Sequence, residues 1–149
     1  MGILDLQLTR SVQLLDDWIL QRKRIEDSSG NLRGADLSHA KLMKADLRKA
    51  DLRGADLSFS YLMRADLTGA NLEGVDLSDS VIIEANLSEA NLEDADLTDA
   101  YLHGTDLRRV RNLTADQIES AFIDRDTLVP EYLQVVWTSE KTFTCAEKT

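Results

Sequence analysis

The sequence predicts an all-β solenoid, a fold in which short extended segments wind into a stack of coils. Three observations predict it. A triplet of the form Ala-Asp-Leu or Ala-Asn-Leu returns every five residues from Gly30 to Arg109 without insertion or deletion. A period of five matches neither the alternation of a strand nor the turn of a helix. The position two before each large residue is nearly always small, which suits a narrow tube filled by side chains. Stacked copies of such a unit bury together the apolar surface that one copy cannot bury alone.

Every pentapeptide in this stretch carries a large aliphatic residue at its centre. The sixteen centres are Leu32, Leu37, Leu42, Leu47, Leu52, Leu57, Leu62, Leu67, Leu72, Leu77, Ile82, Leu87, Leu92, Leu97, Leu102 and Leu107. Burying an aliphatic side chain stabilises a fold by about 1.5 to 3 kcal/mol. We therefore expect the tube to fold without a disulfide or a metal.

The repeat resembles the pentapeptide repeat family, and the resemblance covers Gly30 to Arg109. It implies a right-handed quadrilateral β-helix of about four coils, with one pentapeptide per side. A four-sided coil has a period of twenty, and departures from the repeat recur at that period as Lys41, Tyr61, Val81 and Tyr101. Glycines at the last pentapeptide position fit corners with positive φ, and they are Gly34, Gly54, Gly69, Gly74 and Gly104.

The segment from Met1 to Ser29 precedes the repeat and has helical periodicity. Leu8, Val12, Leu15 and Ile19 share one stripe, which predicts a helix from about Ser11 to Arg24. An open solenoid end exposes leucines and unpaired backbone, so we interpret this helix as a lid on the first coil. A helix that binds a membrane surface or a partner is the alternative.

After Arg109 the frame breaks, and Val110 to Trp137 is expected to close the other end. Thr114-Ala115-Asp116-Gln117 has the pattern of a capping box, which predicts a short helix through Phe122. Ile118, Ala121 and Phe122 are expected to face the top coil. Tyr132 to Trp137 is expected to be extended and docked, and Thr138 to Thr149 to be a flexible tail.

The charge and the cysteine count limit the function classes. A net charge of −10 argues against nonspecific binding to nucleic acid or to an anionic membrane, because phosphates recruit basic surfaces. The single cysteine, Cys145, cannot form an internal disulfide and favours a reducing compartment. No apolar run approaches a membrane span, and the N-terminus lacks a secretory pattern. We expect a cytoplasmic protein without a membrane partner or a direct nucleic-acid partner.

Few side chains are suited to catalysis. His39 and His103 fall at different pentapeptide positions in different coils and should not meet, and Cys145 has no predicted partner. Asp36, Asp56, Asp76 and Asp96 form a carboxylate ladder that could bind Ca²⁺. Asp or Asn also fills this position on other faces, which favours a role in supporting the backbone. We expect no enzyme activity, no cofactor, no metal and no small-molecule substrate.

Charge is distributed unequally along the repeat. The first two coils carry seven basic residues, whereas residues 70–107 carry none and many acidic ones. A solvated surface is one interpretation. The other comes from relatives that act as acidic DNA mimics against topoisomerases. This chain differs from those in its shorter length and its basic first half.

One face departs from the polar repeat and is the candidate protein-contact site. Its outward residues include Met43, Tyr61, Met63, Val81, Ile83 and Tyr101, which we call the apolar stripe. A contiguous exposed apolar stripe usually marks a contact, and Tyr and Met are favoured in interfaces. We expect a protein partner or self-association at the stripe, with coverage by Tyr132 to Trp137 as the alternative. The predicted function is a non-enzymatic protein-binding scaffold, and the alternative is a DNA mimic that binds a DNA-binding protein such as a topoisomerase.

Overall fold

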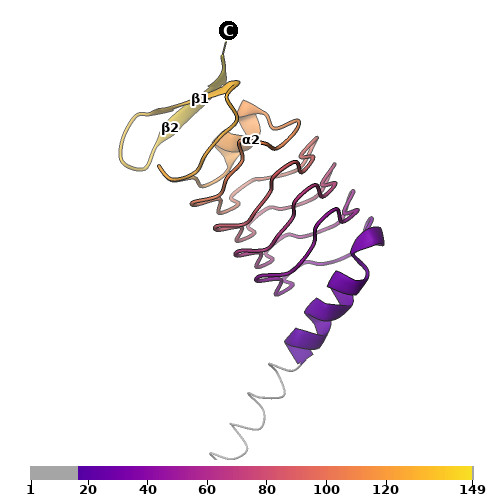
Figure 1. The fold of residues 1–149 in the computed structure, drawn as a ribbon. Helices are drawn as coiled ribbons and strands as arrows, with labels where there is room; N and C mark the ends of the chain where they lie inside the picture. The colour runs from indigo at the N-terminus through magenta and orange to yellow at the C-terminus, as the bar shows by residue number, and fades with distance from the viewer. Residues whose placement is uncertain (1–16, 149) are drawn as a thin grey trace, which may run out of the picture.

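A stack of coils forms the body of the molecule, with a helix below it and a hairpin above it (Figure 1). The computed structural model describes residues 17–148. Residues 17–27 are helical and are followed by a 3-10 turn, η1, at Ser29–Asn31. The coils lead into a short helix, α2 (Ala115–Ser120), and two strands, β1 (Leu133–Trp137) and β2 (Phe143–Glu147).

The coils are held together by single parallel β-bridges rather than by long strands. From Asp36 to Arg111, each bridge joins a residue to the one twenty positions later, as in Asp36 to Asp56 or Tyr61 to Val81. Four columns of bridges run up the stack, one for each side of the coil. Around a bridge the backbone bonds are short, such as Tyr61 N–H to the Ala40 carbonyl at 2.9 Å and Leu62 N–H to the Val81 carbonyl at 2.8 Å. The period of twenty expected from the departures is therefore present in the structure.

The repeat centres fill the interior of the tube. From Leu42 to Leu107, every centre is at most 2% exposed, and the small residues two positions earlier are buried beside them. Leu32 and Leu37, in the first coil, are slightly more exposed at 7% and 8%. The apolar residues of the repeat thus form one continuous core along the rod.

Every corner from residue 34 to residue 104 has positive φ. The five glycines have φ between 62° and 67°, which confirms the expectation for them. The other corners use residues such as Lys44 (φ 58°) and Arg64 (φ 58°), for which this conformation costs about 1 to 2 kcal/mol. The corner amide explains why it is tolerated: Lys44 N–H donates to the Met63 carbonyl of the next coil at 2.9 Å.

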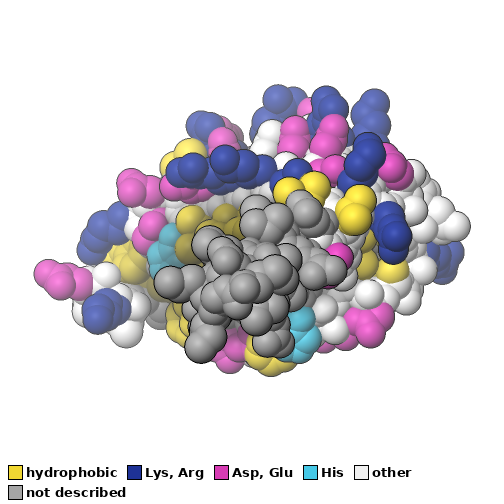
Figure 2. Space-filling view, turned by 90° about the horizontal axis from the view of Figure 1, so that it is seen from below, with side chains coloured by type: hydrophobic (Ala, Val, Ile, Leu, Met, Phe, Trp, Pro, Cys, Tyr) yellow, Lys and Arg dark blue, Asp and Glu magenta, His cyan; other side chains and the backbone are white. Residues whose placement is uncertain are grey.

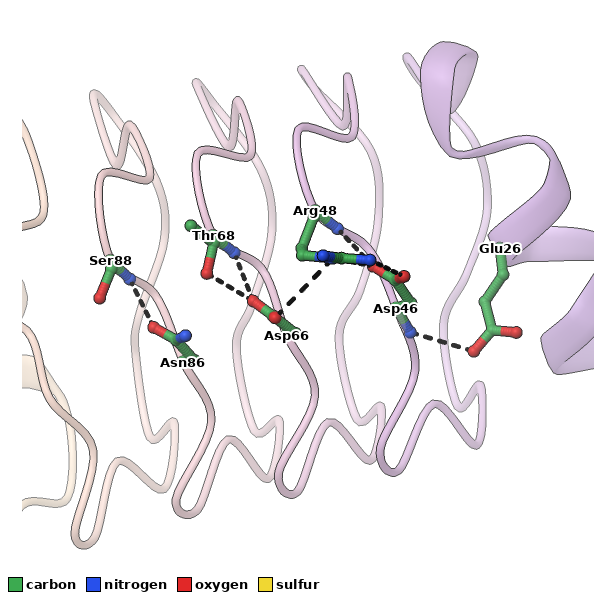
Figure 3. A network of polar contacts seen from close by, with 7 residues as sticks. All are labelled: Glu26, Asp46, Arg48, Asp66, Thr68, Asn86 and Ser88. Carbon is green, nitrogen blue, oxygen red and sulfur yellow. Dashed lines mark hydrogen bonds and ion pairs between the residues drawn. The ribbon is translucent and has the colours of Figure 1, made fainter.

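The Asp and Asn residues of the repeat support the backbone of their own turn. Asp56 accepts from the Ser58 amide at 2.9 Å, and Asp66 accepts from the Thr68 amide at 3.0 Å. The same contact to the residue two positions later occurs at Asn86, as Figure 3 shows along one column. This agrees with the backbone-supporting role inferred from the recurrence of these residues on several faces.

The N-terminal helix bonds to the first coil where a preceding coil would otherwise lie. Trp18 Nε1 donates to the Lys41 carbonyl, and an Arg22 nitrogen donates to the Met43 carbonyl at 3.1 Å. The Asp46 amide donates to Glu26 Oε1 at 3.0 Å (Figure 3). Ile25 joins the core at 8% exposure. These contacts carry the helix to residue 27, beyond the predicted end at Arg24, whereas residues 11–16 of that prediction lie outside the described residues.

At the other end, the chain continues the stack for part of a further coil. Arg111 still bridges to Asn91, and Phe122 and Leu128 bridge to Tyr101 and Asp106. Helix α2 lies between these bridges and begins with the predicted capping box at Thr114 and Gln117. It ends at Ser120, because Ala121 is extended (φ −100°, ψ 164°).

The placement of Phe122 was wrong in the sequence-based prediction. Ile118 and Ala121 are buried as expected, but Phe122 is 44% exposed. Since the extended backbone at Ala121 sends successive side chains to opposite sides, an inward Ala121 makes Phe122 point outward.

The prediction of a flexible tail from Thr138 to Thr149 was also wrong for the part that is described. Strand β2 pairs antiparallel with β1, with Val135 opposite Cys145. Cys145 is buried rather than lying in a loose polar tail, and its amide donates to Glu119 of α2 at 2.7 Å. Five residues give little periodic signal, and the stability of β2 comes from pairing with β1 and from packing on α2, so the sequence alone did not predict this strand.

Two buried serines at equivalent inward positions give a test of the interior. Ser80 Oγ donates to the Leu77 carbonyl at 2.6 Å, whereas Ser60 Oγ has no hydrogen-bond partner within residues 17–148. We predict that Ser60→Ala raises the free energy of unfolding by about 1 kcal/mol, because it removes an unpaired buried hydroxyl. The same substitution at Ser80 removes a bonded hydroxyl and should be neutral or destabilising. Urea denaturation of both variants checks the difference, and an equal response would contradict it.

Candidate protein-contact face

The structure places the outward aromatic and aliphatic residues of one side in a continuous column. Lys41, Tyr61, Val81 and Tyr101 bridge to one another in order, and Phe122 continues the column. The Tyr101 and Phe122 rings are 5.0 Å apart between centroids. Tyr61 and Tyr101 are 43% and 40% exposed. The column therefore presents apolar surface to solvent along the length of the rod.

A second column lies beside it and forms a shallow groove of about 270 Å³. Met43, Met63 and Ile83 line this groove, and Lys44, Arg64 and Glu84 border it at the corner. His103 stands at the next position of this column, with its ring 6.1 Å from that of Tyr101. All six residues of the apolar stripe thus lie on one side of the coil.

Two aromatic residues of this surface were missed by sequence reasoning. Phe122 extends the stripe but falls twenty-one residues after Tyr101. The extra residue puts it out of frame, so no periodic pattern could identify it. Phe59 is 47% exposed at the neighbouring corner and stacks on His39 with centroids 5.1 Å apart. The sequence distinguishes Phe59 only by its apolar side chain at a corner position that Gly and charged residues mostly fill.

The C-terminal hairpin packs elsewhere and does not cover the stripe. The Tyr132 hydroxyl donates to the Leu113 carbonyl at 2.8 Å, and Trp137 packs against Phe143 and under Arg125. Strand β2 contacts α2 at the end of the rod. The alternative in which Tyr132 to Trp137 covers the stripe is therefore wrong.

The carboxylates of the repeat are held by hydrogen bonds within their own turns. Hydrogen bonds from Ser38 lower the pKa of Asp36, and those from Thr98 lower the pKa of Asp96. The Arg48 guanidinium, together with its amide, lowers the pKa of Asp46 to about 2. Within residues 17–148, no group of three or more His, Cys, Asp or Glu side chains could hold a metal ion. Each of these carboxylates is already engaged by its own turn.

The histidines and the cysteine lie apart. His39 contacts Phe59 and His103 contacts Tyr101, in different coils. Burial, and then the nearby Glu119 carboxylate, raise the pKa of the Cys145 thiol, which disfavours the reactive thiolate. These side chains do not assemble into a nucleophile with an orienting base.

A family model described as pentapeptide repeats matches eight copies, at residues 28–58, 60–99 and 78–111. These segments cover more than half of the chain. The chain belongs to the pentapeptide repeat family. Proteins of this family form right-handed β-helices, and the four columns of parallel bridges in this chain agree with a four-sided β-helix. No curated protein matches the sequence.

Solved structures of pentapeptide repeat proteins are similar to this one. A pentapeptide repeat protein (Rfr23) from the cyanobacterium Cyanothece 51142 is 29% identical, with a TM-score of 0.60 over 65% of this chain. The match also spans 65% of the length of that protein. The protein alr5209 from Nostoc PCC 7120 is 31% identical, with a TM-score of 0.49 over 68% of this chain and 78% of its own.

The surface of this pentapeptide repeat protein changes in charge along the rod. Seven Lys and Arg residues lie within residues 30–69, whereas residues 70–107 carry none. Seen from below, Lys and Arg side chains line the upper edge of the molecule, with Asp and Glu side chains among them (Figure 2). Among the described residues, no helix has both the length and the apolar composition to cross a bilayer.

Proposed function

We propose that this protein is a non-enzymatic binding module that contacts another protein through the apolar stripe. The observation that carries the proposal is the column Lys41, Tyr61, Val81, Tyr101 and Phe122, which forms the only side of the coil, among residues 17–148, without repeated Asp or Asn. Elsewhere a carboxylate or an amide accepts from the amide two residues later. Such a bond contributes about 0.5 to 1.5 kcal/mol.

In each coil, this side therefore lacks the stabilising hydrogen bond from Asp or Asn to the backbone and presents apolar surface instead. Residues held on a stack of hydrogen-bonded coils lose little conformational freedom on binding, which lowers the cost of association. Tyr and Met suit such a surface, because both are enriched where proteins meet. A rigid rod with one apolar side is the form expected of a scaffold.

The decisive experiment removes apolar surface from the centre of the stripe. We predict that the double variant Tyr61→Ser, Ile83→Ser loses partners that the wild type retains, while its melting temperature barely changes. Neither residue is an inward repeat centre, so the core is untouched. Pull-downs analysed by quantitative mass spectrometry, beside thermal melts, measure both effects. Val136→Ser is the matched control, because Val136 is 49% exposed on β1, away from the stripe.

Two outcomes would contradict the proposal. Unchanged capture by the double variant would mean that the stripe is an idle exposed surface. A large fall in melting temperature would mean that its residues serve the fold.

The same pull-down separates the stripe from the alternative of an acidic DNA mimic. Binding through apolar surface should survive molar salt, whereas binding through the acidic residues 70–107 should weaken steeply as salt rises. Partners that depend on salt and are indifferent to Tyr61 and Ile83 would favour mimicry.

A further inference from the structure

The apolar stripe is bordered by charges that change sign along the rod. One corner carries Lys44, Arg64 and Glu84 in successive coils, and Arg64 pairs with Glu84 at 2.6 Å. The opposite corner carries His39, Phe59, Asp79 and Asp99 in the same order. Both borders are thus basic or neutral in the lower half and acidic in the upper half.

We propose that the occupant of the stripe is a second copy of this chain, packed face to face and antiparallel about a two-fold axis. The proposal rests on the proposed function of the stripe and names its partner. The axis crosses the face at right angles to the rod, midway between the coils of Tyr61 and Val81. Reversing the rod in this way brings the lower half of each copy onto the upper half of the other.

This arrangement matches apolar groups with apolar groups. Tyr61 meets Val81 of the second copy, and Met63 meets Ile83, each twice by symmetry. Lys41 meets Tyr101, a pairing that places an ammonium over an aromatic ring. A two-fold interface of this kind requires self-complementary surfaces, which the order of residues along both columns supplies.

The charged border is also complementary. Arg64 of each copy meets Glu84 of the other, so the two internal ion pairs form a square of alternating charge. The side chains are 62% and 51% exposed and therefore free to make a second contact. Shifting the register by one coil would place Glu84 on Glu84, or Arg64 on Arg64 with Lys44 on Glu84, and either shift loses both Arg64–Glu84 contacts between the copies.

A parallel pair is disfavoured by the same charges. With both rods pointing the same way, the left border of one copy would meet the right border of the other in the same coil. Glu84 of each copy would then face Asp79 of the other. Like charges placed together across an interface oppose association.

The face is small, so the dimer should be weak. Four coil rises of ~4.8 Å give a stripe about 19 Å long, and one side of five residues spans at most about 16 Å. The projected area of roughly 300 Å² per copy is well below the about 800 Å² per partner typical of stable complexes. Self-association should therefore appear only at high protein concentration.

Charge reversal tests the partner, the direction and the register together. Sedimentation equilibrium from micromolar to millimolar protein should show a monomer–dimer equilibrium for the wild type. Arg64→Glu and Glu84→Arg should each raise the dissociation constant on the order of tenfold, because each places like charges at both symmetry-related contacts of this border. An equimolar mixture of the two variants should restore dimerisation, since every Glu then meets an Arg of the other chain. Neither chain regains its internal pair, so the recovery reports only the contact between copies.

The control and the contrary outcomes are distinct. Glu73→Arg makes the same charge change on the opposite side of the rod and should leave the equilibrium unchanged, and thermal melts should show that all variants fold. A wild type that stays monomeric at every concentration overturns the second copy as occupant. If neither Arg64→Glu nor Glu84→Arg changes the dissociation constant, the dimer does not form through this face. If the equimolar mixture of the two variants does not dimerise, the antiparallel register is wrong. If the wild type is monomeric but its captured partners are still lost with Tyr61→Ser, Ile83→Ser, self-pairing fails while the proposed function stands.

Discussion

Replacing Leu67 with alanine is expected to lower the free energy of unfolding by about 2 to 5 kcal/mol. Leu67 is 1% exposed at the centre of the tube, and Leu72, at 0%, should behave alike. The cost is large because the surrounding backbone is bonded to the coils above and below it. Leu67 N–H, for example, donates to the Asn86 carbonyl at 2.8 Å. Walls held in this way cannot collapse into the space that the side chain leaves.

Urea denaturation measures this effect, and Glu73→Ala is the control. Glu73 is an exposed neighbour of Leu72, so its truncation should change stability by less than about 0.5 kcal/mol. Similar losses at Leu67 and Glu73 would mean that the inward and outward assignments are mistaken.

Removing residues 1–27 is expected to make the protein associate through its first coil and to lower its melting temperature. The deletion takes away the side chains of Trp18, Arg22 and Glu26 that bond to the backbone of Lys41, Met43 and Asp46. It also uncovers the apolar surface against which Ile25 packs. Unpaired backbone beside apolar surface is a template for edge-to-edge pairing. Light scattering over a concentration series and thermal melts measure the two effects.

Point variants separate loss of the contact from loss of the segment. Ile25→Ser disrupts the buried residue of this helix and should shift both quantities in the direction of the deletion. Ile19→Ser makes the same substitution on the same helix, but Ile19 is 42% exposed. It should change neither the association nor the melting temperature. A deletion variant that stays monomeric and melts where the full chain does would show that the helix closes nothing. The interpretation as a partner-binding helix would then gain support.

The sequence by itself was sufficient for the solenoid, for its inward residues and for the side on which the apolar stripe lies. Repetition made this possible. The central position, which Leu67 occupies in its pentapeptide, recurs sixteen times with an aliphatic residue, and this repetition identifies it as inward. The recurrence of Tyr61, Val81 and Tyr101 every twenty residues indicates a coil of four sides. The Asp and Asn residues were assigned to backbone support by the same logic, because a role that recurs on several faces belongs to the position.

Only the tertiary structure decided how the C-terminal end of the rod is closed. Phe122 points outward because Ala121 leaves the helical conformation, a local event that no period records. Strand β2 exists through its pairing with β1 and its packing on α2, which are contacts between segments outside the repeat. The corners show the same division. Glycine predicted positive φ at five of them, while at corners such as Lys44 and Arg64 the amide donates to a carbonyl of the next coil, and this bond imposes positive φ there. The sequence predicts structure well where the same pattern recurs in every repeat. Outside the repeat, contacts between segments determine the structure, and a periodic pattern does not reveal them.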